Sequence, residues 1–110
     1  MYPADVPSVR PGEVSDGAAI LDVREDDEWA AGHIAGSAHV PMSEIVRRVA
    51  EVPATDPLVV VCRVGARSAQ VTAWLRAQGR DARNLDGGLL SWTAAGRRLV
   101  TDSGAPGGVA

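Results

Sequence analysis

The chain carries one cysteine, Cys62, where an apolar segment gives way to a short loop. That loop reads CRVGARS and holds one glycine, Gly65, between Arg63 and Arg67. A loop that enters a helix points unpaired backbone N–H groups into one concavity, and the helix dipole adds positive potential there. Such a nest binds anions and favours a thiolate over a thiol. We therefore predict a nucleophilic thiolate at Cys62, beside a site for an anionic substrate.

An alternative is that Cys62 is simply a small buried hydrophobe. A lone cysteine after three valines is most often of that kind. The flanking Arg63 and Arg67 argue against it, because a cysteine that only packs needs no positive charges beside it. The strand end, the glycine, the two arginines and the helix start together favour a functional thiolate.

Two other kinds of chemistry fit the sequence poorly. His33 and His39 with Cys62 match no closed zinc pattern, so we predict no metal site and no cofactor. Ser68 and Ser91 have no obvious histidine partner, which argues against a serine hydrolase.

Acidic and basic residues also gather further upstream, at Asp22, Arg24, Glu28 and His33. They could act as paired acids with a base. We favour a structural interpretation, in which a carboxylate tethers Arg24 and His33 bonds to the backbone. Asp22 and Arg24 end a strand that should neighbour the one before Cys62, so they are candidates for a pocket wall.

The elements around Cys62 follow from local patterns. Residues 58–61, LVVV, read as a strand buried on both faces of a parallel sheet. After the loop, Val71, Trp74 and Leu75 share one stripe of a helix, and Gly79 ends it.

The remaining chain alternates short strands with short helices. Strands are predicted at 6–9, 18–23, 38–40 and 81–85, and helices at 25–31, 44–52 (capped by Ser43) and 89–95. The polar strand at 81–85 reads as an edge. The alternation predicts an α/β fold with a parallel-rich sheet covered by helices on both faces. Ligand sites in such sheets lie beyond the carboxyl ends of the strands, which is where Cys62 falls.

Three segments, in order, resemble the signatures of the rhodanese family: LDVREDDEWAAGHIAGSAHVP at 21–41, CRVGARS at 62–68 and NLDGGLLSW at 84–92. The resemblance implies a rhodanese-like three-layer fold with a central parallel sheet of about five strands. It further implies that residues 1–110 form a single rhodanese-like domain, in which 101–110 would be a loose tail.

The resemblance implies a sulfurtransferase. Cys62 would take a sulfane sulfur from thiosulfate or another persulfide donor, become a persulfide, and give the sulfur to cyanide in an assay or to a thiol in a cell. The substrate-binding loop would comprise Arg63, Val64, Gly65, Ala66, Arg67 and Ser68. Arg67, at the helix start, is the arginine we favour as a loop brace. Val64 is apolar where many relatives are polar, so the preferred donor could differ from thiosulfate.

Three other roles stay open. One is a regulatory binding module, although members of the family without catalysis usually lose the cysteine. Another is a persulfide carrier that docks onto a partner protein in a sulfur relay. The third is a phosphatase or arsenate reductase of the same fold, whose loop is Cys-x5-Arg, whereas Arg67 gives Cys-x4-Arg here.

The composition limits the number of domains, the partners and the cellular location that are expected. With 110 residues the chain is the size of one domain, and its net charge of −3 argues against nucleic acid as a partner. The first residues have neither a basic start nor an apolar segment, so no signal peptide is expected, and no apolar run is long enough to suggest a membrane protein. One cysteine cannot form an internal disulfide, which predicts a reducing, cytoplasmic location.

Overall fold

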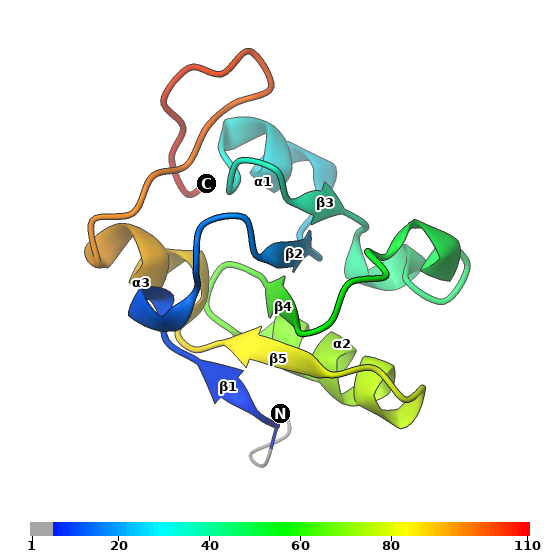
Figure 1. The fold of residues 1–110 in the computed structure, drawn as a ribbon. Helices are drawn as coiled ribbons and strands as arrows, with labels where there is room; N and C mark the ends of the chain where they lie inside the picture. The colour runs from blue at the N-terminus through cyan, green and yellow to red at the C-terminus, as the bar shows by residue number, and fades with distance from the viewer. Residues whose placement is uncertain (1–5) are drawn as a thin grey trace.

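The computed structural model describes residues 6–110, so the first five residues of the expected domain lie outside the described part. The chain forms one five-stranded parallel sheet in the order β1-β5-β4-β2-β3 (Figure 1). The elements are β1 (Ser8–Val9), β2 (Ala19–Asp22), α1 (Asp26–Ala31), β3 (Ala38–His39), β4 (Leu58–Val61), α2 (Ala66–Ala77), β5 (Ala82–Leu85) and α3 (Gly88–Ala94). The predicted α/β fold is confirmed.

The central strand β4 is buried on both faces, as its unbroken apolar run predicts. Leu58 and Val60 point into a core cluster with α2, while Val59 and Val61 point into a second cluster with α3. This alternation is the ordinary side-chain period of a strand. Cys62 continues it and lies in the first cluster, so its side chain is on the face that α2 covers.

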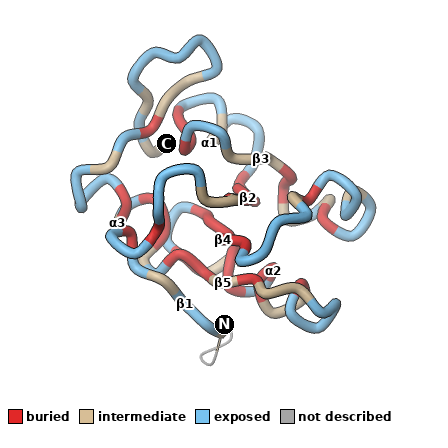
Figure 2. Tube along the Cα trace, in the orientation of Figure 1, coloured by how far each residue is buried: buried red, intermediate tan, exposed pale blue. Residues whose placement is uncertain are grey.

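Two apolar layers enclose the sheet, and the buried residues gather along β4 and β5 between them (Figure 2). The first cluster contains Ile45, Val52, Val71 and Leu75 from the 42–52 segment and α2. The second contains Val14, Ile34, Leu89, Trp92 and Leu99 from the segments on the opposite face. No helix within residues 6–110 is long and apolar enough to cross a membrane.

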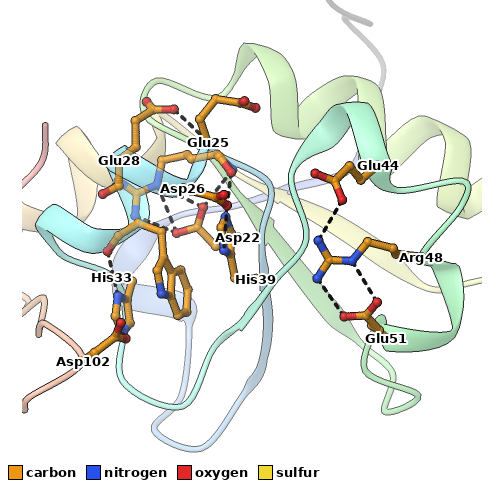
Figure 3. Close-up of polar contacts among 12 residues, drawn as sticks. Asp22, Glu25, Asp26, Glu28, His33, His39, Glu44, Arg48, Glu51 and Asp102 are labelled. Atoms are coloured by element: carbon orange, nitrogen blue, oxygen red, sulfur yellow. Dashed lines mark hydrogen bonds and ion pairs between the residues drawn. The ribbon is translucent and has the colours of Figure 1, made fainter.

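The prediction of a helix at 44–52 is wrong. The segment instead holds two short 3₁₀ helices, η2 (Met42–Glu44) and η3 (Val49–Glu51), and the first is preceded by Pro41 and not capped by Ser43. β-Branched residues weaken the helical preference here, and Arg48 leaves the helical region with φ −109° and ψ 26°. Its guanidinium binds both Glu44 and Glu51 and ties the two turns together (Figure 3).

The edge position predicted for strand 81–85 is also wrong, because β5 lies between β1 and β4. Its polar side chains have specific partners that explain the polarity. Arg83 pairs with Asp81, and Asn84 donates to the carbonyl of Gly65. The true edges are β1 and β3, each two residues long, and short edges limit pairing with other chains.

The tail expected to be loose makes defined contacts instead. The N–H of Gly107 donates to Leu99 O, and the N–H of Gly108 donates to Ala31 O. A Cβ on Gly32 would lie 2.6 Å from Gly108 N, so the two backbones touch. The tail thus folds back beside α1, where Val109 packs against the second core cluster (Figure 1).

Candidate active site

The sulfur of Cys62 is surrounded by hydrogen-bond donors from its own loop. The backbone N–H of Gly65 lies 3.1 Å from Sγ, the N–H of Ser68 lies 3.3 Å away, and the Ser68 hydroxyl lies 3.2 Å away. Cys62 is only 1% exposed, so the sulfur lies at the bottom of the loop. Three converging donors distinguish it from a cysteine that merely packs among apolar side chains.

The tight turn depends on Gly65. Its φ of +104° lies in the left-handed region, which glycine adopts without the strain that a Cβ would bring. The residue stands immediately before α2, and its carbonyl accepts the first helical bond, from Ala69 N. The turn therefore aims the Gly65 N–H at the sulfur while starting the helix behind it.

The loop is also supported by the start of α3, which begins at Gly88, one residue before the helix predicted at 89–95. Leu89 N donates to Cys62 O at 2.9 Å, and Leu90 N donates to Arg63 O at 3.1 Å. A Cβ on Gly88 would lie 2.5 Å from Arg63 O, so only a glycine lets the two segments approach this closely. This contact explains why position 88 is a glycine.

Arg67 crosses from the loop to α1 and binds Glu28 with both ends of its guanidinium, at 2.6 and 2.9 Å. The hydrogen bonds from Arg67 lower the pKa of Glu28 from 4.5 to about 2, and the carboxylate in turn raises the pKa of Arg67. This paired geometry is what a loop brace requires.

The other loop residues lie nearer the surface. Arg63 donates from Nε to Ala110 O at 3.1 Å, which brings the tail to the loop. Val64 is 48% exposed. Ala66 is the first residue of α2 and contributes no functional side chain.

Asp22 and Arg24 form an ion pair in which both side chains are fully buried. Arg24 also donates to the carbonyls of Glu28 and Gly32, so it fastens α1 to the end of β2. The predicted tether of Arg24 is confirmed. Neither side chain has exposed surface, so a role in the pocket wall stays a prediction.

The rings of His33 and His39 both stack on the ring of Trp29. The ring of His33 lies 3.5 Å from that of Trp29, and the ring of His39 lies 4.7 Å from it. His33 Nδ1 donates to Trp29 O and His39 Nε2 to Arg24 O (Figure 3). These bonds confirm the structural interpretation of His33. Within residues 6–110, no three metal-binding side chains gather into one group.

Replacement of Glu28 by glutamine is expected to lower the free energy of unfolding by an amount that depends on pH. Above about pH 4.5 the carboxylate is charged in both the folded and the unfolded chain, and its contribution to stability is complete. Since its pKa in the folded protein is about 2, that contribution is lost as the pH falls from about 4.5 toward 2. Urea unfolding should therefore show a stability difference between wild type and Glu28→Gln at pH 7 that shrinks at pH 3.

Glu51→Gln is the matched control for this measurement. Glu51 binds Arg48 with a side chain that is 54% exposed, and ion pairs of that kind contribute little. An equal pH-dependent difference in the two variants would contradict a special role for the Glu28–Arg67 pair.

The chain resembles known proteins over most of its length. The rhodanese-like domain family matches residues 12–95. A thiosulfate sulfurtransferase GlpE of Pseudomonas paraeruginosa is 39% identical over 77 residues, covering 69% of this chain and 70% of that protein. The HTH-type transcriptional regulator Rv0324 of Mycobacterium tuberculosis is 38% identical over 100 residues, covering 88% of this chain but 41% of the regulator. A solved rhodanese-related protein from Thermoplasma volcanium superposes with a TM-score of 0.81 at 28% identity, covering 87% of this chain and 99% of that one.

Proposed function

The chain belongs to the rhodanese-like domain family, and from that premise we propose that it is a sulfurtransferase whose Cys62 carries the sulfur in transit. The observation that carries the proposal is the convergence of three donors on Cys62 Sγ. Donors placed in this way stabilise negative charge on the sulfur, both as a thiolate and on a second sulfur bound to it.

In the proposed reaction the Cys62 thiolate attacks the outer sulfur of thiosulfate. A bond forms between Sγ and that sulfur, the S–S bond of thiosulfate breaks, and the electron pair leaves with sulfite. The enzyme then holds an anionic persulfide. A second nucleophile, cyanide in an assay or a thiol in a cell, takes the terminal sulfur and restores the thiolate. Two displacements through a covalent intermediate predict ping-pong kinetics.

The reaction needs neither a general base nor a cofactor from this chain. The proposed attacking group is a thiolate held by the three donors to Sγ, and sulfite leaves readily without a proton. The N–H groups of residues 63–68 would hold the terminal sulfur as an oxyanion hole holds oxygen. Arg63 would attract the anionic donor, while Arg67, bound to Glu28, keeps the loop in place.

The identity of the donor depends on how the loop admits it. Cys62 is 1% exposed, and so restricted an approach to the sulfur favours small donors such as thiosulfate. The similarity to a thiosulfate sulfurtransferase supports the same donor. Val64, exposed beside the cysteine, is the residue on which a preference for a less charged persulfide donor would depend.

A second role is favoured by one comparison. The similar transcriptional regulator is much longer than its matched segment, so a related domain occurs there within a larger protein. In such a role Cys62 would carry the persulfide to a docked partner protein, or signal its presence, and would turn over small acceptors poorly. The reduced, unpaired cysteine suits the cytoplasm in either case, and we propose that location.

Incubation with thiosulfate is expected to add one sulfur atom to the peptide that contains Cys62. Mass spectrometry of the intact protein and its peptides measures this addition, and cyanide should remove it with release of thiocyanate. Rapid removal by small thiols favours a free-standing transferase, whereas a stable persulfide favours a carrier.

The same preparation should be given a phosphate ester and a panel of persulfide donors. Hydrolysis of the ester at a rate that rivals sulfur transfer would favour the phosphatase alternative. If no donor in the panel adds sulfur to Cys62, the proposed function is wrong.

A further inference from the structure

Asn84 lies in β5 next to the loop, and the reaction above gives it no part. It is 3% exposed, and its backbone pairs in register with Val60 of β4. Its side-chain Nδ2 donates to Gly65 O at 3.1 Å. Its Oδ1 is buried and has no hydrogen-bond partner among the residues that the structure describes. The Nδ2 group of Asn84 therefore bonds to the loop, whereas Oδ1 has no partner in the described part of the chain.

The unpartnered oxygen shows what the asparagine contributes. A buried acceptor without a partner destabilises the folded state. Leucine has nearly the same branched shape and would carry no such penalty. The bond from Asn84 to Gly65 is thus the one feature that asparagine offers over an apolar residue at this position.

Gly65 is the residue where an external hold matters most. Its N–H donates to Cys62 Sγ, and its left-handed φ of +104° belongs to a residue type with unusual backbone freedom. Its carbonyl accepts two hydrogen bonds, one from Ala69 N in α2 and one from Asn84 Nδ2 in β5. Asn84 is therefore a side chain outside the loop that holds the Gly65–Ala66 peptide, and this peptide shares the Gly65 Cα with the peptide whose N–H meets the sulfur.

We propose that Asn84 is a positioning residue for sulfur transfer, which keeps the Gly65 N–H aimed at the Cys62 sulfur by holding the Gly65 carbonyl. The inference rests on the proposed function, because the charge that it helps to stabilise is that of the thiolate and the persulfide. Asn84 itself touches no reacting atom. It acts through Gly65.

The first test is Asn84→Leu, with persulfide formation followed by rapid-quench mass spectrometry. The rate constant at saturating thiosulfate is expected to fall about tenfold, less than the loss on removing an oxyanion-hole donor outright, because the Gly65 N–H is loosened and not deleted. The concentration for half-saturation should change little. The urea midpoint should stay level or rise, since the unpartnered oxygen is gone.

Val14→Ala is the matched control for stability. Val14 is buried in the second core cluster and belongs to neither the loop nor β5. This variant should lower the urea midpoint and leave the rate of persulfide formation unchanged. A loss of rate in Asn84→Leu without a loss of stability then belongs to positioning.

The second test is Asn84→Asp, which keeps the shape but removes the donor while the carboxylate is ionised. Once protonated, its O–H can donate to Gly65 O again, and burial raises the pKa of such a carboxyl group. The ratio of the variant's rate to the wild-type rate should therefore rise as the pH is lowered from about 8 to about 6. An ionised carboxylate here also destabilises the fold, so the urea midpoint is followed over the same pH range, and a ratio that changes only in step with that midpoint indicates a merely structural role.

The proposal is overturned if Asn84→Leu forms persulfide at the wild-type rate, or if the Asn84→Asp ratio does not change with pH. The pH series decides alone if the leucine variant does not fold. Wild type is measured in the same series, so a failure of the proposed function appears there as absent persulfide, separately from any effect at Asn84.

Discussion

Cys62→Ser is expected to form no persulfide with any donor and to transfer no sulfur above background. The chain has one cysteine, so no second thiol can take over the reaction. The fold should survive, because a serine hydroxyl can accept hydrogen bonds from the same Gly65 and Ser68 donors that contact the sulfur. Transfer to cyanide measures the activity, and urea unfolding measures the stability.

Ser68→Ala distinguishes the contribution of the donors around the sulfur from that of the sulfur itself. This variant keeps the nucleophile and loses one of its donors, the Ser68 hydroxyl. Its activity should be reduced but measurable, because loss of a single donor typically costs about a hundredfold or more in rate without removing the reaction. Residual transfer by Cys62→Ser at the level of Ser68→Ala would show that another group carries the sulfur.

Asp22→Ala is expected to destabilise the protein by about 3–5 kcal/mol, because it leaves the buried guanidinium of Arg24 without its countercharge. Small domains are stable by only about 5–15 kcal/mol, so this loss would remove much of the total. The effect should extend to the loop, since Arg24 holds the Glu28 carbonyl and Glu28 holds Arg67. Urea unfolding followed by tryptophan fluorescence measures it.

Asp56→Ala supplies the contrast, because Asp56 pairs with Arg80 at the surface and such pairs contribute little. A double variant, Asp22→Leu with Arg24→Met, should recover part of the stability lost by Asp22→Ala, since neither charge is then buried alone. If Asp22→Ala loses no more stability than Asp56→Ala, the buried pair does not hold α1 as described.

The central turn could be predicted because each of its signals is local. The apolar run of β4, Gly65 and the apolar stripe of α2 lie within one continuous stretch, and each specifies its own backbone geometry. The tether of Arg24 was also predictable, since Asp22 is only two residues away and joins it at the end of one strand.

The supports of the loop could not be predicted, because they join distant segments through groups that every residue possesses. The bond from Leu89 N to Cys62 O is between main-chain atoms and leaves no mark on residue type. The stretch 81–85 reads as an edge strand because it is polar, and nothing local reveals that the Asn84 amide meets Gly65. The tail is small and polar whether or not it docks, and its docking depends on the close approach of Gly32 and Gly108.

Two of the three donors to the Cys62 sulfur, at Gly65 and Ser68, are main-chain groups. A point mutation can exchange a side chain but cannot delete an amide hydrogen, except by introducing proline. Substitutions at Arg63 and Val64 would therefore change which compounds enter, while the main-chain donors to the sulfur stay in place. In a loop of this kind, substrate preference can change by side-chain substitution while the groups that support the reaction at the sulfur stay the same.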